Sequence, residues 1–465
     1  MTGEPGRNAR VLVLGAGLVA PPLVRYLLAR GATVTVASQF VSRARELVGD
    51  HPRGHGVGLD VPGDMTALEE LVEEADVVVS LLPASFHPVV ARTCVETRTH
   101  LVTTSYVSDE MRELDARARE RGVVLLNECG LDPGIDHMAA MRVIHRVQSE
   151  GGRIVAVHSY CGGLPAPDVN DNPWGYKFSW NPRGVLLAAR NPARYLFEGR
   201  VVDVPPEELF DNCHYLDIAE VGRLQSYPNR DATVYVEKYG LAGVRTMFRG
   251  TLRYPGHCIT WKQLAALGLL DLREMDLAGE TWAGLMRRLA GARPGEDPRE
   301  AVARKLGIGL ASEPMRRFEW LGLFAEEPLP AGVTTPLDAL VARMEERLRY
   351  RPGERDMVVL HDEFLVAANG DDRLSRVTLT LLAFGEVGGD SAMARTVGLP
   401  AAIATRLILE GKVTEPGVRL PTTPDLYGPI LEELAGHGIR VIESREGASS
   451  IVRGGSAPVS AGDPA

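Results

Sequence analysis

The sequence is short of the features that mark secreted, membrane-bound and nucleic-acid-binding proteins. Its 465 residues hold only five cysteines, and none of them forms a CxxC pair. This odd, scattered set argues against disulfides and a zinc site, so we expect reduced thiols, a cytoplasmic protein and no bound metal. The N-terminal MTGEPGRNAR lacks the apolar core of a signal peptide, and no apolar run reaches the ~18 residues of a membrane helix.

Basic tracts are absent as well. The net charge is −10, so the sequence predicts neither nucleic acid nor a membrane as a partner. Hydrophobic residues make up 45% and charged residues 24%, which is ordinary for a globular enzyme. A chain of this length usually folds as two or three domains.

A glycine-containing turn stands out near the N-terminus, in residues 11–20, VLVLGAGLVA. Gly15 permits a tight turn, Gly17 lets a pyrophosphate approach the backbone, and Ala20 lets the following helix pack closely on the strand. The helix N-terminus would offer N–H groups to phosphate. The pattern predicts a dinucleotide site; the alternative is a glycine-rich turn that binds nothing. The predicted contacts are Gly15, Gly17, Leu18, Val19 and Ala20.

The end of the second predicted strand bears on the choice of cofactor. An NAD enzyme usually has an acidic residue there, to accept the ribose 2′-hydroxyl. This chain has Ser38, Gln39 and Phe40 instead, followed by Arg43 and Arg45. We therefore expect NADP, with NAD still possible, because the arginines could equally belong to a solvated first turn of the next helix.

Residues 1–9 are predicted to be a disordered lead-in. Strands and helices then alternate, among them a short strand at 58–61 and a charged helix at 109–121, which predicts an α/β fold with a doubly wound, parallel Rossmann sheet. Ligands bind beyond the carboxyl ends of such strands. The second half differs: strands predicted at 246–254, 356–368 and 374–384 lack crossover helices, which indicates a largely antiparallel sheet in an α+β domain. Residues 168–184 form a long polar and aromatic loop, and about 258–350 read as a charged helical insert.

Several sequence words resemble one family closely, saccharopine reductase, which is the glutamate-forming saccharopine dehydrogenase. They include GAGLVAPPLV, SLLPASFHP, TTSYVS, NECGLDPGIDHM, SYCGGLPAP, DNPWGYKFSW, YPNRD, RGTLRYPG and TVGLPAAIATRLILEGK, in the family's order over residues 10 to about 443. The resemblance implies a homodimer that joins glutamate to α-aminoadipate semialdehyde through an imine, which NADPH reduces to the secondary amine saccharopine, or the reverse. It also implies a second domain with a mixed sheet.

From these patterns we expect the following domains. A dinucleotide-binding Rossmann domain covers 10–131 and is closed by a helix at 391–415. A substrate-binding and dimerisation domain covers 132–257 and 351–390, around the insert at 258–350. A C-terminal segment at 416–445 precedes a disordered tail at 446–465.

The resemblance also assigns contacts residue by residue. Cofactor contacts fall on the glycine turn and on Ser38, Gln39, Phe40, Asp60, Val61, Leu82, Thr104, Ser105, Leu131, Asp132, Pro133 and Ser179, and we add Arg43. Substrate contacts fall on Ser105, Tyr106, Asp132, Arg230, Thr251, Leu252 and Arg253.

The chemistry adds roles to some of these residues. Saccharopine carries three carboxylates, and arginine binds a carboxylate with two parallel hydrogen bonds. Arg230 and Arg253 are the preferred partners, the alternative being an arginine paired with a local acid such as Asp231. Lys177 is a weaker candidate.

Catalytic roles are predicted for three residues. Asp132 would stabilise an iminium charge, although Asp before Pro-Gly is also a common turn former. Cys161 could assist proton transfer, or be a small buried hydrophobe. Tyr106 could orient the substrate or a water. His87 and His137 lie in family-like words, but we expect capping or packing roles for both.

Two departures from the family pattern leave alternatives open. Gln39 stands where the family usually has an arginine, so Arg43 compensates or the NADPH preference is relaxed. Residues 213–223, CHYLDIAEVGR, are unlike the family and lie beside the presumed substrate arginine. One hypothesis is therefore the same imine reduction with another aldehyde or amine partner. Another is a non-catalytic protein that senses NADP(H).

Overall fold

The computed structural model describes residues 9–369 and 373–447 and divides the chain into two compact units. The first unit contains residues 1–152 and 379–443, and the second contains 153–378 and the residues from 444 onward. The predicted disordered lead-in and most of the predicted disordered tail fall on residues 1–8 and 448–465, outside the described residues.

The first unit is built on a seven-stranded sheet in the order β15-β6-β5-β4-β1-β2-β3, and every pairing in it is parallel. Because the order reverses beside β1, the sheet is doubly wound, as predicted. Its strands are β1 (Arg10–Leu14), β2 (Thr33–Ser38), β3 (Gly54–Gly58), β4 (Val77–Ser80), β5 (His100–Thr103), β6 (Val124–Leu126) and β15 (Gly417–Arg419). Its helices are α1 (Ala20–Ala29), α2 (Val41–Val48), α3 (Met65–Glu73), α4 (His87–Thr97), α5 (Asp109–Arg112), α6 (Asp115–Arg121), α7 (Ile135–Ser149), α15 (Ala392–Leu409) and α16 (Pro424–Gly436).

The edge strand β3 lies earlier in the chain than the sequence pattern indicates. The strand was expected at residues 58–61, but it spans GHGVG, a segment with little apolar pattern. Its glycines reflect close packing: a Cβ on Gly56 would lie 2.5 Å from the backbone nitrogen of Arg45 in α2. The short strand is therefore fixed by contact with α2 rather than by hydrophobic periodicity.

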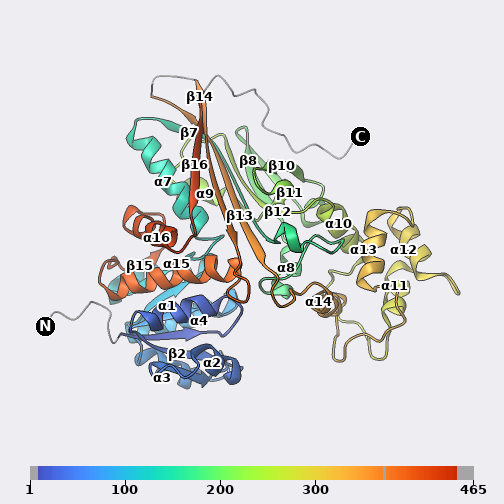
Figure 1. Ribbon diagram of the computed structural model, residues 1–465, viewed down its shortest axis with the longest axis horizontal. Coiled ribbons are helices and arrows are strands. Elements are labelled where there is room, and N and C mark those ends of the chain that lie inside the picture. Colours follow the sequence, from blue (N-terminus) through green and yellow to red (C-terminus); the bar gives the residue numbers. More distant parts are fainter. Residues whose placement is uncertain (1–8, 370–372, 448–465) are drawn as a thin grey trace. The chain divides into compact units, whose positions relative to one another are not determined.

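Helix α15 closes the first unit by packing along α1, as the two labelled ribbons in Figure 1 show. The approach is close, because a Cβ on Gly398 would lie 2.7 Å from the carbonyl oxygen of Val19. By length and hydropathy α15 could pass for a membrane span, but 78% of that 18-residue window is buried inside the protein. It is thus a core helix.

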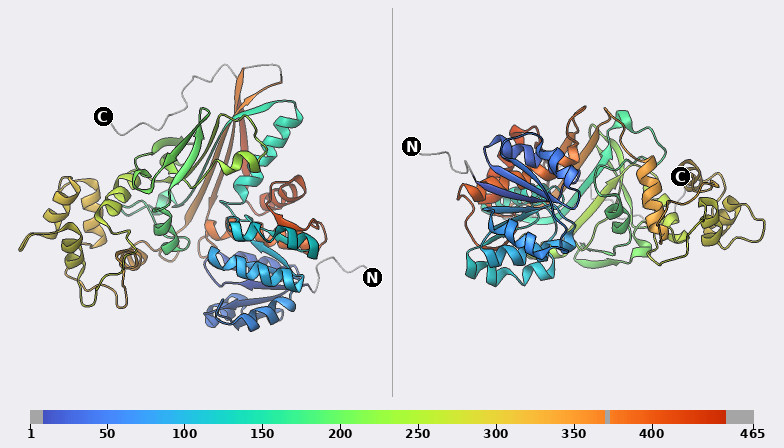
Figure 2. Two further views of the ribbon diagram at one scale, coloured as in Figure 1. Left: turned by 180° about the vertical axis from the view of Figure 1, so that it is seen from behind. Right: turned by 90° about the horizontal axis from the view of Figure 1, so that it is seen from below.

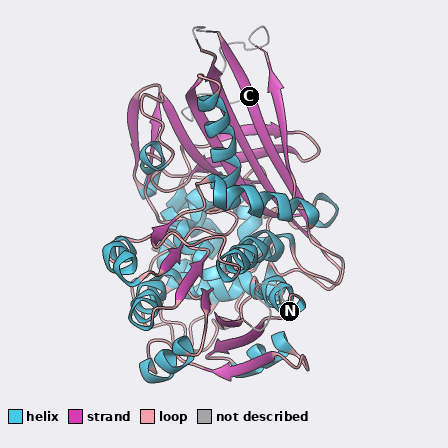
Figure 3. Cartoon of the chain, turned by 90° about the vertical axis from the view of Figure 1, so that its left-hand side faces the viewer, coloured by secondary structure: helices cyan, strands magenta, loops and turns pink. Residues whose placement is uncertain are grey.

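The second unit contains a mixed sheet in the order β10-β11-β12-β7-β13-β14-β16, with β8 beside β12 and β9 beside β8. The β7–β12 pair is parallel, whereas β13 runs antiparallel to β7 and β11 antiparallel to β12. Figure 3 shows the long strands of this sheet lying side by side. They are β7 (Arg153–Pro165), β8 (Ala193–Phe197), β9 (Arg200–Val204), β10 (His214–Ile218), β11 (Gly222–Pro228), β12 (Thr246–Arg253), β13 (Asp356–Ala367), β14 (Leu374–Phe384) and β16 (Val441–Glu446).

The helical insert occupies the middle of this unit, within the range predicted from sequence. Figure 2 shows it as a group of helices in yellow to brown. The helices of the unit are α8 (Pro182–Ala188), α9 (Val234–Lys238), α10 (His257–Leu267), α11 (Trp282–Ala290), α12 (Pro298–Leu306), α13 (Glu313–Leu321) and α14 (Pro336–Arg347).

The boundary between the units lies at Gly152, later than the domain boundary expected at residue 131. The reason is helix α7, which packs against α16 and so stays with the parallel sheet. The second boundary, at Thr378, cuts through β14 rather than falling near residue 390.

Candidate active site

The glycine turn has the shape that a pyrophosphate requires. Gly15 has φ +106°, and a Cβ there would lie 3.1 Å from the carbonyl oxygen of Leu81. A Cβ on Gly17 would meet nothing within 4 Å, so the backbone is open to a ligand at this point. Ala20 is fully buried and begins α1. These residues fit a bound dinucleotide.

The first turn of α1 differs from the sequence expectation in its hydrogen-bond donors. Pro21 and Pro22 carry no N–H group, and the Ala20 N–H donates to the carbonyl of Gly17 at 3.2 Å. The first three helical residues therefore have no N–H left for a phosphate. Backbone donation to an anion has to come from the loop itself, at residues 16–19.

The end of β2 presents an aromatic ring and a cation. Phe40 is 54% exposed, and the Arg43 guanidinium carbon lies 5.3 Å from the centre of its ring. The Ser38 hydroxyl turns inward and accepts a hydrogen bond from the Phe40 N–H at 3.1 Å, whereas Gln39 is exposed. No carboxylate occupies this strand end. Asp60 and Val61 follow β3, and Leu82 and Thr104 follow β4 and β5, at the same carboxyl edge.

Tyr106 and Asp132 meet directly beyond this edge. The Tyr106 hydroxyl donates to Oδ1 of Asp132 at 2.7 Å, and both side chains are partly exposed. Asp132 and Pro133 follow Leu131 in a turn closed by hydrogen bonds between Gly130 and Pro133 and between Ile135 and Gly130. Two of the three predicted catalytic residues are thus hydrogen-bonded to one another.

A buried acid–histidine pair, which no sequence pattern indicates, supports both segments. Glu128 Oε2 lies 2.7 Å from Nε2 of His137, and both side chains are fully buried. The other Glu128 oxygen accepts from the Val107 N–H at 3.0 Å, and the Glu128 N–H donates to the Ser105 carbonyl at 3.2 Å. Glu128 thereby fixes the backbone on both sides of Tyr106.

His87 is a second buried histidine at this edge. Its Nδ1 lies 2.9 Å from the Ser80 hydroxyl, and its Nε2 lies 2.8 Å from that of Ser105 and 3.1 Å from that of Thr103. Burial lowers the pKa of His87 to about 4, so the ring is neutral at physiological pH. The expectation from sequence is a capping or packing role for His87, since hydrogen-bond partners at the ends of other strands cannot be seen in one sequence.

The second unit places Cys161, Thr251 and Arg253 on one face of its sheet. Thr251 pairs with Cys161 in the β7–β12 register, and Arg253 lies two residues further along the same strand. Side chains alternate along a strand, so Thr251 and Arg253 share a face and Leu252 points to the other one. Leu252 is fully buried, and only its carbonyl contacts the site, as acceptor for Arg253 Nη1 at 2.8 Å.

Arg253 is a buried cation that lacks a carboxylate partner within the described residues. Its exposed fraction is 6%, and its guanidinium lies 5.1 Å from the ring of Tyr176. Its Nε is buried without a hydrogen-bond partner in the described part of the chain. A buried charge without a counter-charge is costly, so the guanidinium is chemically suited to binding an anion.

The other predicted residues of this unit are arranged differently. Arg230 is exposed, with a left-handed backbone (φ +55°) in the turn after β11. Lys177 forms ion pairs with Glu354 at 2.8 Å and Asp171 at 2.9 Å, so two carboxylates already balance its charge. Ser179 is buried, and its hydroxyl has no partner within the described residues.

The segment that departs from the family pattern is an edge hairpin, β10 and β11. Asp217 lies directly opposite Arg223 in its register, and the Arg223 guanidinium lies 4.4 Å from the ring of Tyr215. The acidic charge of Asp217 therefore has a basic neighbour across the hairpin. His214, at the start of the hairpin, is buried instead.

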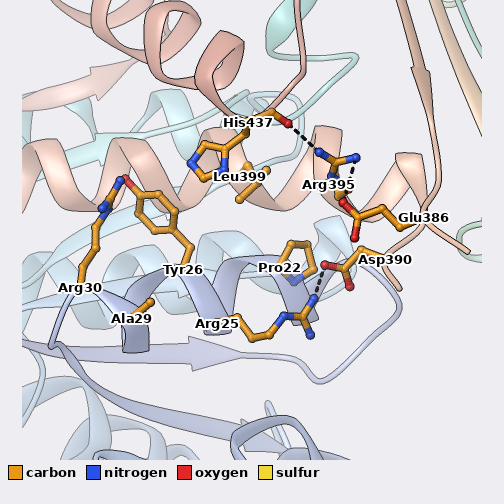
Figure 4. Close-up of a pocket in the computed structure, with 10 residues that line it drawn as sticks. All are labelled: Pro22, Arg25, Tyr26, Ala29, Arg30, Glu386, Asp390, Arg395, Leu399 and His437. Atoms are coloured by element: carbon orange, nitrogen blue, oxygen red, sulfur yellow. Dashed lines mark hydrogen bonds and ion pairs between the residues drawn. The ribbon is translucent and has the colours of Figure 1, made fainter. Parts of the chain in front are cut away.

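A hollow of about 320 Å³ lies between α1 and the segments around α15 and α16, as Figure 4 shows. Its arginines already have partners: Arg25 pairs with Asp390, and Arg395 donates to the His437 carbonyl at 2.6 Å. None of the predicted site residues lines it. The hollow is therefore separate from the candidate active site.

Comparisons with known proteins identify related domains and enzymes. Residues 11–126 match the saccharopine dehydrogenase NADP binding domain, and residues 130–439 match the saccharopine dehydrogenase C-terminal domain. The NADP, L-glutamate-forming saccharopine dehydrogenase of Saccharomyces cerevisiae is 40% identical over 92% of this chain and 97% of the yeast enzyme.

One longer relative and two solved structures are also similar to this chain. Bovine mitochondrial alpha-aminoadipic semialdehyde synthase is 38% identical, and this chain spans 47% of its length. The apo structure of yeast saccharopine dehydrogenase (L-Glu forming) superposes with a TM-score of 0.84 and 38% identity, covering 94% of this chain and all of that one. Homospermidine synthase from Legionella pneumophila shares the fold alone, with a TM-score of 0.55 and 10% identity.

Matches to both domains and to the full length of the yeast enzyme leave one conclusion: the chain belongs to the saccharopine dehydrogenase family, and its first sheet is the family's NADP-binding domain.

Proposed function

We propose that this protein is an NADP-dependent oxidoreductase that acts on the CH–NH bond of saccharopine, in the glutamate-forming manner. The observation that carries the proposal is 40% identity to a yeast enzyme with that activity over 97% of its length. The open glycine turn and the buried Arg253, which lacks a counter-charge among the described residues, supply what such a reaction requires.

The reaction needs a hydride, a proton on nitrogen and a fixed substrate. NADP supplies hydride chemistry when bound at the carboxyl edge of the parallel sheet. In the reductive direction the imine carbon gains the hydride, and the nitrogen keeps the proton that made it an iminium, which gives the secondary amine. The carboxylate of Asp132 stabilises that iminium charge, and the Tyr106 hydroxyl orients the carboxylate through their 2.7 Å hydrogen bond.

The second unit binds the substrate in this proposal. Arg253 receives a carboxylate through its guanidinium, and Thr251, on the same face, adds a hydroxyl donor. Cys161 pairs with Thr251 in the strand register, and 8% of its surface is exposed. This burial favours a packing role for its side chain in the substrate site over proton exchange with solvent. Arg230, exposed in its turn, remains the second proposed carboxylate ligand.

The assembly and location are further parts of the proposal. The family resemblance supports a homodimer that acts on a small amino-acid substrate, and the cysteine pattern supports a cytoplasmic protein. A different aldehyde or amine partner is the second candidate function, because the hairpin at residues 213–223, within the substrate-binding unit, departs from the family pattern.

The deciding experiment is the absorbance at 340 nm of purified protein with saccharopine, run with NADP and again with NAD. Rapid reduction of NADP supports the proposal. Reduction of NAD alone keeps the chemistry and overturns the cofactor assignment. If neither reacts while NADPH binds, the second candidate gains weight, and a panel of other conjugates then separates it from a non-catalytic sensor.

Arg43 provides the test of cofactor preference. Replacing Arg43 by Ala should raise KM for NADP about tenfold and leave KM for NAD unchanged, because one charge-assisted contact to the 2′-phosphate is lost. Arg45→Ala is the matched control, because Arg45 is also exposed and lies two residues further along α2. If both variants raise KM for NADP equally, the arginines act through their general positive charge, and Arg43 makes no specific contact with the 2′-phosphate.

A further inference from the structure

The carboxyl ends of β4 and β5 are joined by one side chain, that of His87. Ser80 ends β4 and Thr103 ends β5, and the two residues pair in the parallel register. The first residue of α4 reaches across both of them with its two ring nitrogens, at 2.9 Å and 3.1 Å. All three of these residues are buried.

The imidazole has one further contact, with the hydroxyl of Ser105. That distance, 2.8 Å, is the shortest of the three, and Ser105 is partly exposed whereas the other partners are buried. The Ser105 N–H also approaches the Thr103 hydroxyl, at 3.4 Å. The ring therefore links the buried hydroxyls of Ser80 and Thr103 to the partly exposed hydroxyl of Ser105.

We propose that His87 is a positioning residue of the active site, which holds the Ser105 hydroxyl toward cofactor and substrate by tying it to the ends of β4 and β5. This inference rests on the proposed function only through the contacts assigned to Ser105. The imidazole takes no part in proton transfer.

The charge state of the ring supports this role. Burial lowers the pKa of His87 to about 4, and its place at the positive end of the α4 dipole acts in the same direction. A neutral imidazole has one donor and one acceptor, and both nitrogens already face hydroxyl groups. The ring can fix the direction of the Ser105 hydroxyl without adding charge beside an iminium.

Two substitutions separate the contacts of the two nitrogens. The amide of His87→Gln reaches the place of Nε2 and can keep the contact with Ser105, whereas that of His87→Asn reaches only the place of Nδ1, toward Ser80. Both remove the ring, so they carry a similar packing cost. We expect His87→Asn to lower kcat/KM about ten- to a hundredfold and His87→Gln to retain most of it.

A double-mutant cycle with Ser105→Ala tests whether the effect passes through the hydroxyl. We expect Ser105→Ala and the double variant with His87→Asn to be equally impaired in kcat/KM. The affinity for NADPH, measured by fluorescence titration, should follow the same pattern. Thermal unfolding of each variant shows whether the fold is retained.

Three results would overturn the inference. They are equal loss in the Gln and Asn variants, full additivity with Ser105→Ala, and a limb of the wild-type pH–rate profile between pH 6 and 7 that disappears in His87→Gln. The NADPH titration needs no amine substrate. If saccharopine proves inert, the proposed function fails, while coupling between His87 and Ser105 in NADPH binding still decides this inference.

Discussion

At the scale of single residues, the proposed site is a small set of charged and polar side chains with buried supports behind them. Asp132, Tyr106 and Arg253 could be proposed from sequence, because carboxylates and arginines have recognisable chemistry and lay in family words. The supports behind them could not. Glu128, His137 and His87 act through hydrogen bonds between different helices, strands and loops, and no spacing rule reports such pairs.

Arg253 offers the sharpest prediction at this scale. Arg253→Lys keeps the charge but loses the planar fork, so KM for saccharopine should rise at least tenfold with NADPH affinity unchanged. Arg253→Met should cost about 2 to 3 kcal/mol in kcat/KM, the usual range for a charged hydrogen bond. Steady-state kinetics beside NADPH titration check both effects.

Arg249→Lys is the matched control, because Arg249 is a buried arginine of the same strand that lies 4.4 Å from the ring of Tyr235. If it raises KM as much as Arg253→Lys does, strand distortion explains the result, and Arg253 is not the carboxylate ligand.

At the scale of elements, the helices and long strands followed the sequence patterns closely, and the exceptions have physical causes. Strand β14 begins and ends where predicted, at Leu374 and Phe384. The single charged helix expected over residues 109–121 is instead two helices, α5 and α6, which are separated by Glu113 and Leu114. Edge strand β3 was misplaced, since close packing on α2 rather than apolar alternation decides its position.

The contact between α1 and α15 gives the prediction at this scale. Gly398→Ala places a Cβ 2.7 Å from the Val19 carbonyl, so α1 must shift. We expect a loss of about 1 to 3 kcal/mol in the free energy of unfolding, together with weaker NADPH binding, because Val19 belongs to the glycine turn. Urea unfolding and NADPH titration are the measurements.

Gly436→Ala, near the end of α16, is the control, since a Cβ there meets nothing within 4 Å. It should be neutral, or stabilising by up to about 1 kcal/mol. Unchanged stability and NADPH affinity in Gly398→Ala would show that the helices do not need this close approach.

At the scale of the whole molecule, each unit contains a neutral buried histidine that acid must charge. Burial lowers the pKa of both His87 and His214 to about 4, and the nearby His158 acts in the same direction on His214. Between pH 6.5 and 4 the unfolded chain therefore binds more protons than the folded one. Stability is fully present above pH 6.5 and falls as the pH drops through this window.

We expect each histidine to lower the free energy of unfolding of its unit by about 3 kcal/mol between pH 6.5 and pH 4. The measurement is urea unfolding from pH 7 to pH 4, followed separately for each unit where the transitions separate. His87→Gln should flatten the pH dependence of the first unit only. A midpoint that does not change with pH in the wild type would contradict the burial argument.

The strand at the far edge of the nucleotide-binding sheet, β15, comes from residues 417–419, and the helix that covers α1 comes from 392–409. A ribosome delivers residues 153–378, the main part of the second unit, before either segment emerges. During synthesis the N-terminal sheet therefore lacks one edge strand, and the apolar side of α1 is exposed to water. Chains truncated within the helical insert should therefore be recognised by chaperones and proteases. NADPH should not stabilise these chains, because their nucleotide-binding domain is incomplete.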